Sequence, residues 1–157
     1  MAKTLDEIMA EEQPENIIYG INSVLLDRIT DWDSRLDSLT KEEQTLFLIC
    51  GLEGEVNNGG FAQFFFNSSG DYSQETLAAL NAIHADLTAH LLRQAMTIFP
   101  GGMPPADQDD RNALIDLMGD DEETLLGNLD DQFYEGKENL SDLLLIYVKE
   151  HKDRFLK

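Results

Sequence analysis

Apolar residues recur with helical spacing through nearly the whole chain, and no stretch alternates between apolar and polar residues as a half-buried strand does. From Glu15 to about Thr30 the isoleucines, valine and leucine fall on one broad face, and the segment from Asn139 to Phe155 is strongly apolar at the same spacing. A chain of 157 residues fits one domain. The sequence therefore predicts an all-α fold, a single compact domain over residues 1–157 with about seven or eight helices.

Capping residues and breakers locate the helix boundaries. Thr40 and Glu43 form a capping box, in which the hydroxyl and the carboxylate satisfy first-turn N–H groups, so a helix is expected to run from there to about Val56. Residues 57–60, Asn-Asn-Gly-Gly, are expected to end that helix, because glycine tolerates left-handed backbone.

Further along the chain, Ser73 is expected to cap a helix, and another helix is expected from Asp86 to about Phe99. Residues 120–123 are expected to form a second capping box. Residues 100–105, Pro-Gly-Gly-Met-Pro-Pro, are the clearest break in the chain. This break separates a moderately charged body from an acidic C-terminal portion, residues 107–142.

Acidic residues dominate the charge of the chain. Thirty-one Asp and Glu residues face 11 Lys and Arg residues, a formal net charge of −20. Residues 107–142 hold 13 carboxylates against Arg111 and Lys137, a local net charge of 2 − 13 = −11. Such a field repels phosphates and argues against direct binding to DNA, RNA or an anionic membrane, so a basic partner is expected. The alternative is an acidic housekeeping fold whose charge only solvates the surface or adapts it to a saline cytoplasm.

The carboxylates of the acidic portion repeat at helical intervals. Asp116, Asp120 and Glu123 stand at i, i+4 and i+7, and a second set begins at Asp131, so each set would line one side of a continuous helix. Neighbours in such a row lie about 5–6 Å apart, a spacing of the same order as that of phosphates along a nucleic-acid strand. The sequence therefore predicts a surface that can replace DNA phosphates. The candidate partner-binding residues are Asp107, Asp109, Asp110, Asp116, Asp120, Glu123, Asp130, Asp131, Glu135, Glu138 and Asp142.

No motif for a metal, a cofactor or a catalytic nucleophile is present. Neither acidic run has the spacing of a calcium-binding loop, and His84 and His90 would point about 120° apart on one helix. From these patterns we expect no metal and no cofactor. The chain also lacks a nucleophile elbow, so no catalytic residue is predicted. A small enzyme would have to be built around residues 53–63, and this alternative stays open. Without a signal-peptide pattern or a membrane-spanning apolar run, a cytoplasmic location is expected.

The segment Glu55–Tyr72, EVNNGGFAQFFFNSSGDY, carries the string N-G-G-F-x-Q-F-F-x-N. Its residues are Asn58, Gly59, Gly60, Phe61, Gln63, Phe64, Phe65 and Asn67. Together with the leucine-patterned Thr76–Ile83, this string resembles the bacterial family grouped around an acidic DNA-mimic protein, whose domain is otherwise catalogued as of unknown function. The resemblance covers most of the chain. One departure is His84, at a position where a glycine often follows the isoleucine.

The resemblance implies an all-helical, non-enzymatic acidic protein that can form a homodimer. In such a protein, surface carboxylates imitate DNA phosphates and occupy the DNA-binding face of a transcription regulator. The phenylalanines of the string are expected in the core and its Asn-Gly-Gly in a turn, so these residues are predicted to be structural. An immunity-like inhibitor of a basic nuclease would use the same physics and stays open, beside the small enzyme and the housekeeping fold.

Overall fold

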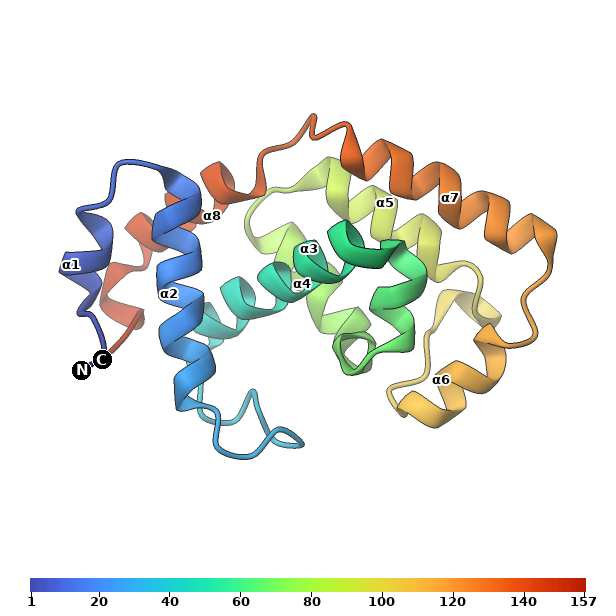
Figure 1. Ribbon diagram of the computed structural model, residues 1–157, viewed down its shortest axis with the longest axis horizontal. Coiled ribbons are helices and arrows are strands. Elements are labelled where there is room, and N and C mark those ends of the chain that lie inside the picture. The colour runs from blue at the N-terminus through green and yellow to red at the C-terminus, as the bar shows by residue number, and fades with distance from the viewer.

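The computed structural model describes residues 1–157 as eight α-helices and three short 3₁₀ helices, without a strand (Figure 1). This confirms the predicted all-α class. The α-helices are α1 (Leu5–Met9), α2 (Pro14–Arg28), α3 (Lys41–Phe66), α4 (Ser73–Ala82), α5 (Asp86–Met96), α6 (Gln108–Ile115), α7 (Asp120–Tyr134) and α8 (Leu140–Glu150). The 3₁₀ helices are η1 (Ser68–Tyr72), η2 (Pro100–Gly102) and η3 (Lys152–Arg154).

Helix α3 is the centre of the fold. It packs against α2, α4, α6, α7, α8 and η1, and one cluster of buried apolar side chains extends from Ile8 in α1 to Phe155 near the C-terminus. Helix α6 and the start of α7 lie at the end of the molecule remote from both chain termini (Figure 1). No helix combines the length and the apolar character needed to cross a membrane.

Helix α3 is kinked at Gly59 and Gly60, where the sequence predicts its end. Gly60 has φ +77° and ψ −178°, a backbone conformation that is essentially restricted to glycine. A Cβ at Gly60 would also collide with the carboxylate of Asp130 on α7. The glycine pair ends one helical segment, as predicted, and a second helical segment begins directly after it at Phe61.

The capping box at the start of α3 is confirmed. The Glu43 N–H donates to Thr40 Oγ1 at 3.1 Å, and the Thr40 N–H donates to the Glu43 carboxylate at 2.9 Å. Glu43 is only 2% exposed, and it also accepts from the Leu156 N–H at 2.8 Å and pairs with Arg28 at 3.3 Å. This buried carboxylate therefore joins α2, α3 and the C-terminal segment.

Three predicted helix boundaries are wrong. Ser73 is the first residue of α4 and not its cap, because η1 runs directly into α4 and the Ser73 hydroxyl donates to the Gly70 carbonyl at 2.7 Å. Helix α5 ends at Met96, since the next three N–H groups bond to carbonyls three residues earlier. Helix α8 ends at Glu150, and residues 152–154 form η3.

Helix α4 ends in a Schellman motif, with His84 in the left-handed position. The Ala85 N–H donates to the Leu80 carbonyl at 2.9 Å, and the His84 N–H donates to the Asn81 carbonyl at 3.1 Å. His84 has φ +61°. Glycine would adopt this backbone without the Cβ penalty.

Arg111 fastens α6 to the kinked end of α3. Its side chain is 0% exposed, and a Cβ at Gly70 would collide with its Nε. The guanidinium donates at 2.6–3.0 Å to the carbonyls of Phe65, Asn67, Pro105 and Ala106 and to the Asp71 carboxylate. Asp71 also pairs with the buried Arg35 at 3.5 Å. One buried cation thus holds the beginning of the acidic portion against α3 and η1.

Candidate functional site

The candidate partner-binding surface begins at the N-terminus of α6. Asp107 is the N-cap, and its carboxylate accepts from the Asp110 N–H at 2.9 Å. Asp109 and Asp110 follow in the first turn, and all three residues are exposed. The positive end of the helix dipole offsets the repulsion among these neighbouring carboxylates. Asp116, directly after α6, is exposed as well.

The second capping box lies one residue earlier than predicted. Gly119 is the N-cap of α7, and its N–H donates to the Glu122 carboxylate at 3.1 Å. Because glycine has no side-chain acceptor, only this half of a box is formed. Asp120, Asp121 and Glu123 therefore stay exposed in the first turn. Asp121 was not among the predicted partner-binding residues, although it belongs to the same acidic run.

We call the exposed carboxylates of these two helix starts the α6–α7 acidic surface. It consists of Asp107, Asp109, Asp110, Asp116, Asp120, Asp121 and Glu123. None of them lies within ion-pair distance of a Lys, Arg or His side chain. The one basic residue in this stretch is Arg111, whose charge is buried and paired with Asp71. No exposed cation of this segment interrupts the surface.

The opposite end of the molecule is different in charge. Lys152 pairs with Asp6 at 2.8 Å, and Arg154 pairs with Glu42 at 3.2 Å. The segments that these pairs join are η3, α1 and the start of α3, which lie away from α6 (Figure 1). The basic C-terminal residues thus compensate acids near the N-terminus and the start of α3, and leave the α6–α7 acidic surface unpaired.

The predicted rows of carboxylates do not follow continuous helices. Residues 116–119 separate α6 from α7, and residues 135–139 separate α7 from α8. The set that begins at Asp116 and the set that begins at Asp131 therefore each cross a helix break. Gly136, with φ +63°, redirects the chain in the second break. The prediction of two helical stripes is wrong, because like charges at these intervals destabilise a helix and glycines allow it to end.

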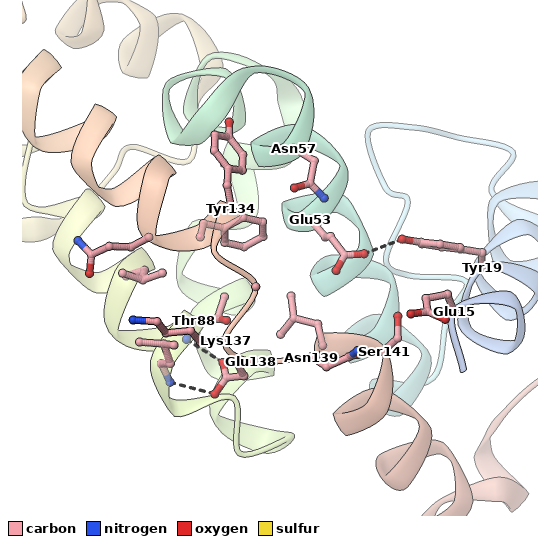
Figure 2. Close-up of a pocket in the computed structure, with 16 residues that line it drawn as sticks. Glu15, Tyr19, Glu53, Asn57, Thr88, Tyr134, Lys137, Glu138, Asn139 and Ser141 are labelled. Carbon is pink, nitrogen blue, oxygen red and sulfur yellow. Dashed lines mark hydrogen bonds between the residues drawn. The ribbon is translucent and has the colours of Figure 1, made fainter. Parts of the chain in front are cut away.

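Two predicted partner-binding residues are engaged inside the fold. Asp130 accepts from the Phe61 N–H at 2.8 Å, beside the kink in α3. Burial raises the pKa of Asp130, and the Phe61 hydrogen bond opposes that rise. Glu138 accepts from the N–H groups of Leu87 and Thr88, at 3.1 and 2.8 Å, and so caps α5 (Figure 2). Both carboxylates satisfy backbone donors at the start of a helical segment.

The three remaining candidates lie outside the α6–α7 acidic surface. Asp131 is exposed on α7. Glu135 pairs with Lys137 at 2.9 Å, which cancels its charge locally. Asp142 is exposed in the first turn of α8, a helix that lies toward the termini (Figure 1). The eleven predicted carboxylates therefore do not form one continuous row.

Most of the chain, residues 37–151, matches the family described as DMP19-like protein. The chain belongs to the DMP19-like protein family. A curated relative is the DNA mimic protein DMP19 of Neisseria meningitidis serogroup B (strain ATCC BAA-335 / MC58), 31% identical over 72 residues. That alignment covers 45% of this chain and 44% of the relative, less than half of each. No solved structure matches the chain. The family recognised from the sequence is thereby confirmed.

In this DMP19-like chain, the aromatic part of the N-G-G-F-x-Q-F-F-x-N string is core, as predicted. Phe61, Phe64 and Phe65 are all 0% exposed. Phe61 meets Phe133 of α7 edge to face, with ring centroids 6.0 Å apart, and Phe65 meets Phe99 at 5.0 Å. These rings join the kinked half of α3 to its neighbours.

The polar side chains of the same string form a network around Glu55. Gln63 Nε2 and Asn67 Nδ2 donate to Glu55 Oε2 at 2.7 and 2.9 Å, and the Ser69 hydroxyl donates to Oε1 at 3.2 Å. Asn58 Nδ2 donates to Gln63 Oε1 at 3.1 Å. The sequence predicts a structural role for this string. The polar side chains of this network bond chiefly to one another, because the kink brings the two halves of α3 together.

Glu53 faces a separate cleft of about 290 Å³, bounded by α2, α3, α5 and the α7–α8 connection (Figure 2). Tyr19 Oη donates to Glu53 at 2.9 Å, and this hydrogen bond raises the pKa of Tyr19 to about 12. Glu53 and Glu55, which the enzyme alternative would combine, line different hollows. No group of three His, Cys, Asp or Glu side chains is arranged to hold a metal ion.

Proposed function

We propose that this chain is a DNA-mimic protein, whose α6–α7 acidic surface binds a basic DNA-binding protein at the face that otherwise binds DNA. Membership of the DMP19-like family and the similarity to the Neisseria DNA mimic protein support this proposal. The observation that carries it is the unpaired set of exposed carboxylates between Asp107 and Glu123, in a stretch whose one basic residue is buried.

The distribution of charge favours recognition over solubility alone. A surface that only keeps a protein soluble works well with both signs interspersed. Here the exposed Lys152 and Arg154 form ion pairs far from α6, while the α6–α7 acidic surface has no such pair. An uncompensated negative field attracts a Lys- and Arg-rich face and accelerates the encounter with it.

The surface is also held in place before a partner arrives. Arg111 anchors the first turn of α6 through buried hydrogen bonds to α3, η1 and the connection before α6. Asp107 and Glu122 bond backbone N–H groups at the two helix starts. Ordered side chains and backbone lower the entropic cost of binding. Carboxylates on this frame can act as fixed anionic positions in the way that phosphates do.

We further propose that the partner is a transcription regulator, that the protein performs no catalytic step, and that the encounter occurs in the cytoplasm. The family resemblance supports the first two, and a partner that binds DNA would meet this protein in the cytoplasm. The resemblance also implies a homodimer. Its presence is tested by the molar mass from light scattering of the protein as it elutes from a size-exclusion column at low and high salt.

The test compares two triple variants with the same change in net charge. The surface variant is Asp116→Asn, Asp120→Asn, Glu123→Gln, and the control is Glu12→Gln, Glu15→Gln, Asp27→Asn, on exposed residues near the other end. Each immobilised protein captures basic proteins from an extract of the native cell. The captured protein is then measured for binding to a labelled DNA duplex in competition with wild type and variants.

We expect the surface variant to compete at least tenfold more weakly, a change of about 1.4 kcal/mol, and the control to compete like wild type. The affinity of wild type for the captured protein, measured directly in the absence of DNA, should fall by roughly tenfold or more between about 50 and 200 mM salt, since exposed charges are screened within about 8–10 Å. Equal competition by all three proteins would refute the proposed surface. A captured nuclease whose cleavage is blocked would replace the transcription regulator by the inhibitor alternative.

A further inference from the structure

A second cavity, of about 430 Å³, lies between α2, α3, η1 and the connection of residues 29–40. Its volume is within the range of small-molecule sites, roughly 300–1,000 Å³. One part of its wall is apolar and the other polar. The apolar lining includes Leu26, Trp32, Phe47 and Leu48, and the polar lining includes Asn22, Glu55, Asn58, Gln63 and Ser69. Trp32 is 48% and Leu26 43% exposed, so the cavity opens to solvent beside apolar side chains.

Two glycines in the first half of α3 leave this cavity open. Gly51 and Gly54 line it, and a Cβ built on either would meet no atom within 4 Å. Neither glycine has positive φ, and neither permits a close contact with another element. Glycine is among the poorest helix formers. Two glycines on one face of α3 therefore lower its helix propensity locally, and the absence of their side chains leaves the cavity open.

The polar wall offers hydrogen-bond acceptors. Glu55 is oriented by donors from Gln63, Asn67 and Ser69. Its Oε1 accepts only the Ser69 hydroxyl, so it can accept another donor. A ligand group with several N–H donors and a positive charge complements these atoms.

The guanidinium that lines this cavity is already paired within the protein. Arg35 also lines it, with its guanidinium stacked over the rings of Trp32 and Tyr72. Its Nη groups donate to the carbonyls of Trp32 and Ser68, and it pairs with Asp71. The negative field of the whole chain, with a net charge of −20, further favours cations over anions.

We propose that this cavity binds a small organic cation, a protonated primary amine on an aromatic or short aliphatic body. The ammonium donates to Glu55, and the body lies against Trp32 and Phe47. This site is additional to the proposed mimicry, because it contains none of the carboxylates of the α6–α7 acidic surface.

Trp32 provides the readout, since it is the one tryptophan of the chain. Phenethylamine and n-butylamine are titrated into the protein at up to millimolar concentration, with excitation selective for tryptophan. The comparison ligands are 3-phenylpropionate, an anion of similar shape, and 3-phenylpropanol, a neutral one. We expect a saturable change in Trp32 fluorescence with phenethylamine, a weaker one with the alcohol and none with the anion.

Two variants locate the binding. Gly51→Leu fills the cavity from α3, and its matched control is Gly127→Leu in α7, where a Cβ also meets no atom within 4 Å. Leucine favours helix at both positions, so both proteins should fold. We expect Gly51→Leu to weaken phenethylamine binding by roughly tenfold or more, because the side chain occupies the ligand's volume, and Gly127→Leu to leave it unchanged.

Glu55→Gln keeps acceptor capacity but removes the charge, so phenethylamine should lose its advantage over 3-phenylpropanol. Absence of a saturable signal with either amine would overturn the proposal. Tighter binding of 3-phenylpropionate than of phenethylamine, or equal amine binding by wild type and Gly51→Leu, would overturn it too. These results are independent of DNA competition, so failure here leaves the proposed function standing.

Discussion

Arg111→Met should loosen the attachment of α6 and destabilise the whole protein. The guanidinium is 0% exposed and donates to four backbone carbonyls and to Asp71. Methionine fills similar volume but donates nothing, so buried acceptors lose their donor. Removal of one partner from a buried ion pair costs about 3–5 kcal/mol. Asp71 keeps Arg35 at 3.5 Å, which places the expected loss in the lower half of that range.

Urea unfolding followed by circular dichroism measures this loss. With a urea m-value of about 2 kcal/mol/M, a loss of about 3 kcal/mol lowers the midpoint by about 1.5 M at nearly constant m. Amide hydrogen exchange should show a larger loss of protection in α6 than in α2. The control is Arg93→Met on α5, an exposed arginine, which should change stability by less than about 0.5 kcal/mol. If the two variants unfold at the same urea concentration, Arg111 does not anchor α6 as described.

Two further predictions concern stability. His84→Gly should raise the free energy of unfolding by about 1 kcal/mol, because His84 has φ +61° in the Schellman motif. The midpoint of thermal unfolding should rise by about 2–4 °C. His84→Ala retains the backbone strain and should show no such gain. Burial raises the pKa of Asp130 above its ordinary value of 3.8, so the folded state binds this proton more tightly than the unfolded state. Asp130 therefore makes stability rise as the pH falls from above its folded pKa toward 3.8. Asp130→Asn preserves an acceptor for Phe61 and removes this contribution. The free energy of unfolding of the variant, relative to that of wild type, should therefore be greatest near neutral pH and decrease toward pH 4. A difference between the two free energies, measured by urea unfolding, that does not change with pH would contradict the pKa shift.

The stability variants and the mimicry test separate fold from recognition. Arg111 is not exposed and cannot touch a partner, yet it positions the first turn of α6. Arg111→Met should therefore weaken competition with DNA through disorder of α6, together with lost hydrogen-exchange protection. The surface variant at Asp116, Asp120 and Glu123 should weaken competition while protection of α6 stays unchanged.

Much of the fold was predictable because it depends on neighbours in sequence. The box of Thr40 and Glu43 forms within one helical turn, and the glycine pair at residues 59 and 60 changes direction by its own backbone freedom. The phenylalanines that follow share one helical face and are buried together. Where local prediction failed, as at Ser73, a neighbouring 3₁₀ turn supplied the hydrogen bonds instead.

Whether each carboxylate is free to bind a partner was not predictable from its neighbours in sequence. Asp130 is engaged because Phe61, 69 positions away, presents an N–H group at the kink. Glu138 is engaged because the start of α5, about 50 positions away, needs a cap. Both looked like surface charges in a local reading. Helical spacing also suggested stripes, although the chain breaks its helices between the acidic turns.

The sequence alone determined the all-helical class, the helix break at residues 57–60, the family and the concentration of acid after residue 106, because these follow from composition and short-range spacing. The tertiary structure decided which charges reach solvent. It buried Arg111, the one cation between Asp107 and Glu123, and turned Asp130 and Glu138 inward. Solvent exposure and pairing depend on atoms brought together from distant positions in the chain, and only the packed helices supply them.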